Sequence, residues 1–74
     1  MNIEVAWEII EDKVTNIVIH RLMAGKHVIL RIWDKKDEKR KDFRFYWIDG
    51  NGEYHYHSSL ASAKKIVNKW FGVK

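Results

Sequence analysis

The tetrapeptide Asp-Gly-Asn-Gly, residues 49–52, restricts the fold more than any other feature, because alternating segments flank it. "FRFYWI" (43–48) precedes it and "EYHYH" (53–57) follows it. Gly and Asn accept the positive φ that tight turns between antiparallel strands require. The sequence therefore predicts an antiparallel hairpin here, and "HVILRIW" (27–33) is predicted as a further strand by the same period of two.

The N-terminal third has apolar residues at helical spacings, namely Ile3, Trp7, Ile10, Val14, Ile17, Val18 and Leu22. With Gly25 as a C-terminal cap, this pattern predicts one helix over about residues 3–24. A competing interpretation pairs a strand at residues 3–9, where apolar residues alternate, with a shorter helix from Asp12. The β-branched residues at 17–19 weaken both helical interpretations.

The C-terminal segment "SSLASAKKIVNKWF" (58–71) predicts a second helix, capped by Ser58 or Ser59 and followed by Gly72. The resulting order is α-β-β-β-α. We therefore expect a single small α+β domain over residues 1–74, in which an N-terminal and a C-terminal helix pack on a three-stranded antiparallel sheet.

Strand alternation predicts which side chains share a face of this sheet. The face under the helices is expected to carry the apolar set Val28, Leu30, Ile32, Phe43, Phe45, Trp47, Tyr54 and Tyr56. The opposite face is expected to carry Ile29, Arg31, Trp33, Arg44, Tyr46, His55 and His57.

The composition limits the class of protein. The chain is 46% hydrophobic and has four Trp, three Tyr and three Phe, which supply the buried area that a short chain needs. It has no cysteine, so we expect no disulfides, no thiolate chemistry and a reducing, cytoplasmic location. Its apolar runs are too short to span a bilayer and no leader pattern is visible, so we expect no membrane partner.

The net charge of +4 is unevenly distributed. Residues 1–12 carry acids and no base, whereas residues 13–74 hold all 14 Lys and Arg against six acids. A basic body of this kind suggests a polyanionic partner. The alternative is that the charge serves only solubility.

The uncovered sheet face is the main candidate site. Arg31 and Arg44 are expected on neighbouring strands, with Trp33 and Tyr46 beside them. Guanidinium groups contact phosphates or guanine edges, and aromatic rings stack on exposed bases, so this face suggests DNA or RNA as partner. The same face could instead dock a protein partner or a second copy in a homodimer, with Trp and Arg as anchors.

Further bases could support such a contact. The run "DKKDEKRKD" (34–42) contains Lys39, Arg40 and Lys41, but its five bases and four acids also suit a solvated loop. Lys64 and Lys65 fall in the first turns of the C-terminal helix, where a phosphate is favoured, although solvated lysines are common on such helices.

We expect no metal, no cofactor and no catalysis. His55 and His57 have the spacing of some metal ligands, but no third ligand is evident, so we interpret them as exposed or nucleic-acid-facing histidines. "DGNGEY" is similar to the start of a calcium loop, yet Tyr54 and Leu60 replace the required Gly and Glu, so it is interpreted as a turn. The serines at 58–59 are caps, and no carboxylate pair is placed in a cleft.

The α-β-β-β-α order, the basic balance and "SSLASAKKIVNKWF" together resemble a double-stranded-RNA-binding domain. This resemblance implies RNA contacts by Lys64 and Lys65, and by the neighbourhood of Lys35 and Lys36.

The last two strands and the helix, "FRFYWIDGNGEYHYHSSLASAKKIVNKW", are also similar to the three-stranded DNA-binding arm of tyrosine integrases. That resemblance implies that Arg31, Arg44 and Tyr46 read DNA from the sheet.

Overall fold

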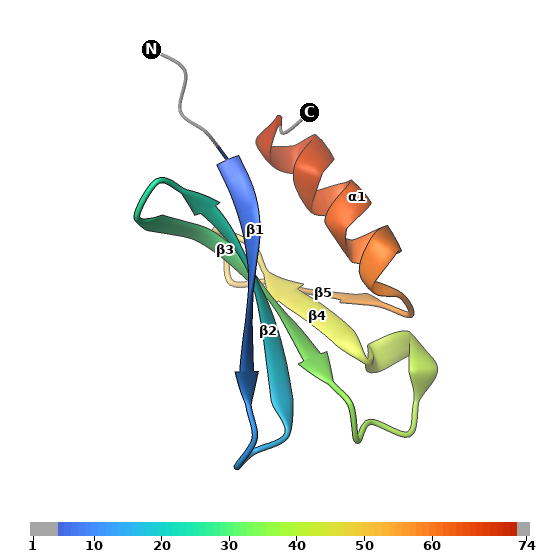
Figure 1. Cartoon of the computed structure of the whole chain (residues 1–74). Helices are drawn as coiled ribbons and strands as arrows, with labels where there is room; N and C mark the ends of the chain where they lie inside the picture. Colours follow the sequence, from blue (N-terminus) through green and yellow to red (C-terminus); the bar gives the residue numbers. More distant parts are fainter. Residues whose placement is uncertain (1–4, 73–74) are drawn as a thin grey trace.

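The computed structural model describes residues 5–72, which form a five-stranded antiparallel sheet followed by one helix (Figure 1). The strands are β1 (Val5–Asp12), β2 (Ile17–Ala24), β3 (His27–Lys35), β4 (Phe45–Ile48) and β5 (Tyr54–His57). A short 3-10 turn, η1 (Lys41–Phe43), precedes β4, and the helix α1 (Leu60–Phe71) follows β5. The strand order in the sheet is the order in the chain.

The predicted N-terminal helix is wrong, and so is the three-stranded sheet. In the described part of residues 3–24 the chain forms the β1–β2 hairpin, so the fold is α+β with five strands and one C-terminal helix. Asp12 Oδ1 accepts the backbone N–H groups of Val14 and Thr15 at 2.9 and 3.4 Å, and Asn16 has φ 58°. This local turn chemistry reverses the chain where the helix was expected to continue.

The other N-terminal expectations are corrected in the same way. The competing strand over residues 3–9 agrees with β1 for the residues that the structure describes, but no helix begins at Asp12. Gly25 caps no helix: it is the first of two residues between the paired Ala24 and His27, with φ 61°. A positive φ at the first residue of such a turn matches the twist of the adjoining strands.

The C-terminal expectations are confirmed. The hairpin around residues 49–52 joins β4 to β5. The Ser59 hydroxyl accepts the N–H of Ser62 at 3.2 Å and caps α1, while Gly72 ends it with φ 66°. The described residues include no helix of the length and apolarity needed to cross a membrane.

One face of the sheet packs against α1 and forms the core, which we call the covered face (Figure 1). Leu22, Ile32, Trp47 and Val67 are fully buried there. The cluster is completed by Leu30, Phe45 and Ala63. Apolar side chains from three strands thus meet one stripe of the helix.

The opposite face, which we call the open face, has no described element lying over it (Figure 1). A helix is about 10 Å wide, whereas five strands span roughly 24 Å, so α1 cannot cover even its own side completely. Ile9, on the covered side of the edge strand β1, accordingly remains 64% exposed. Apolar and aromatic side chains therefore remain at the surface on both sides.

Two substitutions distinguish the hairpin from the helix that the spacing suggested. Val14 and Leu22 would share one buried helical stripe, but Val14 is 96% exposed in the β1–β2 turn and Leu22 is fully buried. Leu22→Ala should lower the free energy of unfolding by about 2–5 kcal/mol, because it removes buried methyl groups and leaves a cavity. Val14→Ser should change it by less than about 0.5 kcal/mol. Urea denaturation measures both; comparable losses would contradict the hairpin.

Candidate functional site

A row of aromatic rings crosses the open face on β3, β4 and β5. Cross-strand pairing of Tyr46 with both Trp33 and Tyr56 places these side chains on one face. The Trp33 and Tyr46 ring centroids lie 6.1 Å apart with planes 11° apart, and Tyr46 and Tyr54 lie 5.8 Å apart at 22°. Phe43 meets Tyr56 edge-on at 4.9 Å. We call these five residues the aromatic stripe.

The aromatic stripe is accessible from solvent. Tyr54 is 56% exposed and Tyr56 is 42% exposed, while Trp33 and Tyr46 are half-buried. Desolvation, followed by the neighbouring tyrosines, raises the pKa of Tyr46 above its usual value. Contiguous exposed aromatic area of this kind commonly marks an interaction site.

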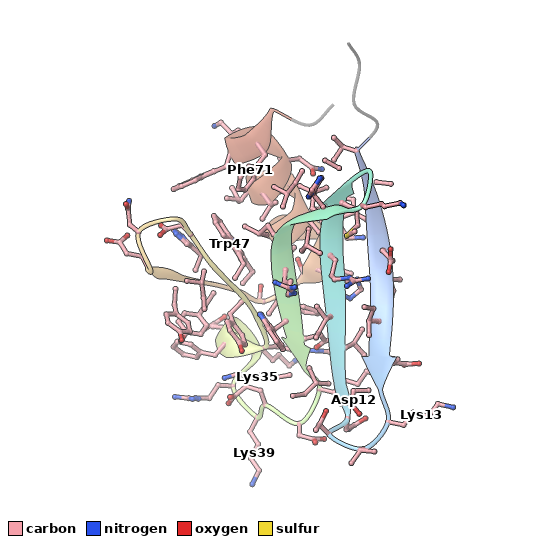
Figure 2. The ribbon with its side chains drawn as sticks, turned by 90° about the vertical axis from the view of Figure 1, so that its left-hand side faces the viewer. Asp12, Lys13, Lys35, Lys39, Trp47 and Phe71 are labelled. Carbon is pink, nitrogen blue, oxygen red and sulfur yellow. The ribbon has the colours of Figure 1, made fainter. Side chains whose placement is uncertain are left out.

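Cationic side chains adjoin the aromatic stripe. Lys35 Nζ lies 4.9 Å from the Tyr46 ring centroid, and the Arg40 guanidinium lies 4.6 Å from the Phe43 ring. Arg40 Nε also donates to Glu38 at 3.1 Å, and this hydrogen bond holds the pKa of Glu38 below its usual value. Figure 2 looks onto the open face and shows Lys35 directed toward the β4–β5 side. Arg40 is thus paired with Glu38, whereas no ion pair among the described residues engages Lys35.

Arg31 lies on the open face beside a hollow between β3 and β4. The hollow has a volume of about 270 Å³ and is lined by Ile29, Leu30, Arg31, Trp33 and Ile48. Arg31 is exposed, and its cross-strand neighbour Arg21 forms an ion pair with Glu8. Among the described residues no ion pair engages Arg31, so its charge is available to a ligand.

The strand alternation predicted that Arg44 lies beside Arg31 on the open face, and this prediction is wrong. Its Nε and Nη2 donate to the two carboxylate oxygens of Asp34 at 2.8 and 3.3 Å. Asp34 is buried opposite Phe45 on the covered side, and the bond to Asp34 raises the pKa of Arg44. The chain enters β4 from η1, so alternation does not extend back to Arg44. Arg31 and Arg44 point to opposite sides of the sheet.

The side chains of β5 also lie on the opposite faces of the sheet from those predicted. His55 stacks on Trp47 with centroids 4.1 Å apart, and the Trp47 indole N–H donates to His57 Nε2 at 3.0 Å. Both histidines therefore face the covered side, and Tyr54 and Tyr56 face outward. The half-buried imidazoles find partners there, whereas the tyrosine hydroxyls can remain in water.

The hairpin turn fixes this register through Asp49. Its Oδ1 accepts the backbone N–H groups of Asn51 and Glu53 at 2.8 and 3.0 Å, and its Oδ2 lies 2.7 Å from His55 Nε2. These hydrogen bonds, that of His55 first, lower the pKa of Asp49. Both carboxylate oxygens are thus engaged in holding the hairpin.

The possible metal ligands differ from the histidine pair considered in the sequence. His57 is engaged by Trp47, so the two histidines do not form a ligand pair. Asp49, Glu53 and His55 instead bring ligand atoms within 4.8 Å of one another. The Asp49 carboxylate already accepts hydrogen bonds from the hairpin backbone and contacts His55. We therefore interpret these three residues as stabilising the turn predicted for residues 49–52.

The remaining predicted bases lie elsewhere. Lys64 Nζ sits 5.1 Å from the Trp7 ring on the covered side, and Lys65 is exposed on the same helix. Lys39 and Lys41 are exposed in the connection between β3 and β4, and Lys39 extends away from the sheet (Figure 2). The structure therefore brings Arg31, Trp33 and Tyr46 together and leaves Lys64 and Lys65 on the other side.

Sequence reasoning missed four members of the site. Phe43, Tyr54 and Tyr56 were assigned to the covered face, and Lys35 was considered only through a family resemblance. The available signal was the "EYHYH" alternation itself, in which either the tyrosines or the histidines had to face outward.

Comparison of the chain with protein-family models, with curated proteins and with solved structures gave no match.

A buried histidine makes stability depend on pH. His20 is 6% exposed and its Nδ1 has no hydrogen-bond partner. Burial lowers the pKa of His20 from 6.5, the nearby Lys64 charge lowers it further, and Asp34 opposes the shift. The unfolded chain thus binds a proton more readily than the native one just below pH 6.5, so stability falls as pH falls there.

His20→Leu should reduce this pH dependence and raise stability at neutral pH by about 1 kcal/mol, because it removes an unsatisfied buried polar atom. Urea denaturation on both sides of the histidine range measures the difference. His27→Gln changes an exposed histidine and serves as the control. If both variants kept the same pH dependence as the parent, burial of His20 would not be its source.

Proposed function

We propose that the protein is a non-enzymatic module that binds single-stranded nucleic acid through the aromatic stripe. The observation that supports this proposal is an uncovered sheet face on which exposed rings adjoin Lys35 and Arg31. Aromatic rings stack on bases of any sequence, and cations beside them bind the phosphates of the same strand.

The charge around the aromatic stripe favours a polyanion over a protein partner. One acid of the open face is neutralised within the fold, since Glu8 pairs with Arg21. Asp34, which follows Trp33 directly, points to the covered side and pairs with Arg44. Lys35, Arg40 and Arg31 therefore adjoin the accessible rings and can meet a polyanion there.

The form of the face favours single strands. Rings can stack on bases only where the bases are not already stacked in a duplex. The stripe extends over three adjacent strands, which is about 10 Å at the usual strand spacing. That width suits contact with a few successive bases, and the rest of the strand would extend toward Lys39 and Lys41 in the charged loop between β3 and β4.

A second candidate is a protein-interaction module, which the free edge of β1 favours. Among the described strands, β1 pairs only with β2, and Ile9 on it is 64% exposed. Such an edge can add a strand from a protein partner or from a second copy. Concentration-dependent sedimentation that Ile9→Lys abolishes would support this alternative, and binding that is insensitive to salt would disfavour nucleic acid.

Fluorescence anisotropy with a labelled single strand of about ten nucleotides tests the proposed function. Tyr54→Ala and Tyr56→Ala should each weaken binding by roughly 5- to 150-fold, the loss expected for one stacked base. Affinity should also fall steeply between about 50 and 200 mM salt, because bound phosphates release counterions.

Phe71→Ala provides a matched control, because Phe71 is 44% exposed but lies on α1. It should leave affinity unchanged, as should the combined change of Lys64 and Lys65 to Ala. Absence of any complex at low salt, or equal losses from Phe71→Ala, would rule out the aromatic stripe as the binding surface. A loss confined to the lysine variant and to duplex RNA would favour the helix surface implied by the RNA-binding-domain resemblance.

A further inference from the structure

We propose that the hollow between β3 and β4 accepts one guanine base of the bound strand, with Arg31 reading that base. This inference rests on the proposed function, because it concerns a specific position within the same open face. It adds a sequence preference to a surface whose aromatic contacts are themselves tolerant of sequence.

The hollow exists because β4 leaves β3 early. The pairing of these strands consists of Trp33 with Tyr46 and Asp34 with Phe45. Arg31 and Ile48 would be the next pair on the open face, but the described pairing does not include them. Figure 2 shows the β4–β5 hairpin diverging from β3. The separation opens a site at the end of the aromatic stripe, next to Trp33.

The dimensions and walls of the hollow suit one planar base. Its volume of about 270 Å³ lies just below the range of about 300–1,000 Å³ that is usual for pockets that hold drug-sized molecules. Ile29, Ile48 and the Trp33 ring supply apolar walls. A purine can therefore contact these walls while its polar edge faces the remaining polar side chain.

Arg31 is that polar side chain, and its chemistry selects among bases. A guanidinium only donates hydrogen bonds and presents its N–H groups as a fork. Guanine offers two neighbouring acceptors, O6 and N7, whereas the corresponding edge of adenine pairs an acceptor with a donor. Cytosine also has adjacent acceptors in a single strand, but its one ring leaves more of the hollow unfilled.

The position of Arg31 also suggests a role other than stability. It lies directly opposite Arg21 on β2, and like charges in opposed positions destabilise a sheet. Arg21 is compensated by Glu8, while Arg31 remains exposed at the hollow. An arrangement that is unfavourable in the free protein becomes favourable when Arg31 gains an acceptor pair.

The backbone adds polar groups to the same site. Lys35 N–H donates to Arg44 C=O at 2.9 Å, so this N–H points toward β4. Backbone groups in a strand alternate between its two edges, and those of Arg31, four residues earlier, therefore point to the same side. There the described pairing with β4 has ended, so they can assist in holding a base edge.

Oligothymidines of about ten nucleotides with one central guanine, adenine, cytosine or 7-deazaguanine test the inference by anisotropy. Guanine should bind roughly tenfold or more tightly than adenine, and 7-deazaguanine, which lacks N7, should lose most of that gain. Arg31→Lys keeps the charge but removes the fork, so it should abolish the preference while keeping the salt dependence.

Two further variants separate the possible failures. Ile48→Trp should fill the hollow and abolish the guanine preference without removing oligothymidine binding. Tyr54→Ala should weaken all four strands equally. Equal affinity for guanine and adenine in the parent would refute the proposed guanine pocket, as would a preference that survives Arg31→Lys and Ile48→Trp. Neither result would contradict binding by the aromatic stripe. Failure to bind any strand would instead refute the proposed function, and the pocket with it.

Discussion

The structure depends on a geometric constraint: one short helix has to provide the cover for a five-stranded sheet. At 12 residues, α1 is about 18 Å long and roughly 10 Å wide, while the sheet is more than twice as wide. The helix therefore buries one patch centred on Trp47, Leu22 and Ile32, and the other face stays open. Whatever lies on the open face has to be compatible with water or serve as a binding surface.

The chain distributes its polar groups according to this constraint. On the covered side each of several polar side chains has an internal partner: His55 has Asp49, His57 has the Trp47 indole, and Arg44 has Asp34. On the open side, Tyr54 and Tyr56 are exposed, and Arg31 and Lys35 remain available. The internal hydrogen bonds of the covered side fix the register of the fold, and the open side supports the proposed binding.

Local chemistry explains which parts of the fold the sequence could predict. Ser59, Gly72 and residues 49–52 act within a few residues of themselves, so their roles follow from the sequence alone. The N-terminal hairpin was hidden because β1 has apolar residues on both faces: Ile9 and Ile10 are neighbours, so strand alternation is blurred and helical spacings appear. Gly25 suits a helix cap or a turn, and only pairing with β3 decides between them.

The site shows the same limit. Arg31, Trp33 and Tyr46 were assigned to the correct face because each lies within a regular strand, where side chains alternate between the two faces. Arg44 and the β5 side chains were assigned to the wrong face of the sheet. The alternation of side chains between the two faces does not continue through η1 or through the loop at residues 49–53. Two side-chain contacts hold these residues on the covered side, that of Arg44 with Asp34 and that of His55 with Asp49. They join residues that come close together only after folding.

The central claim is that the open face, and not the helix side, binds the nucleic acid strand. Of the four tryptophans, Trp33 lies on the open face and the other three lie on the covered side. Trp47 is in the core, Trp70 meets it edge-on from the end of α1, and Trp7 lies beside Lys64. A ¹H–¹⁵N spectrum of the indole N–H groups during titration with a single strand therefore locates the contact directly. We expect the Trp33 signal to shift, together with the amides of Arg31 and Tyr54, while those of Trp7 and Trp70 stay in place. Shifts confined to Trp7 and the start of α1, or an unchanged Trp33 at saturation, would contradict it.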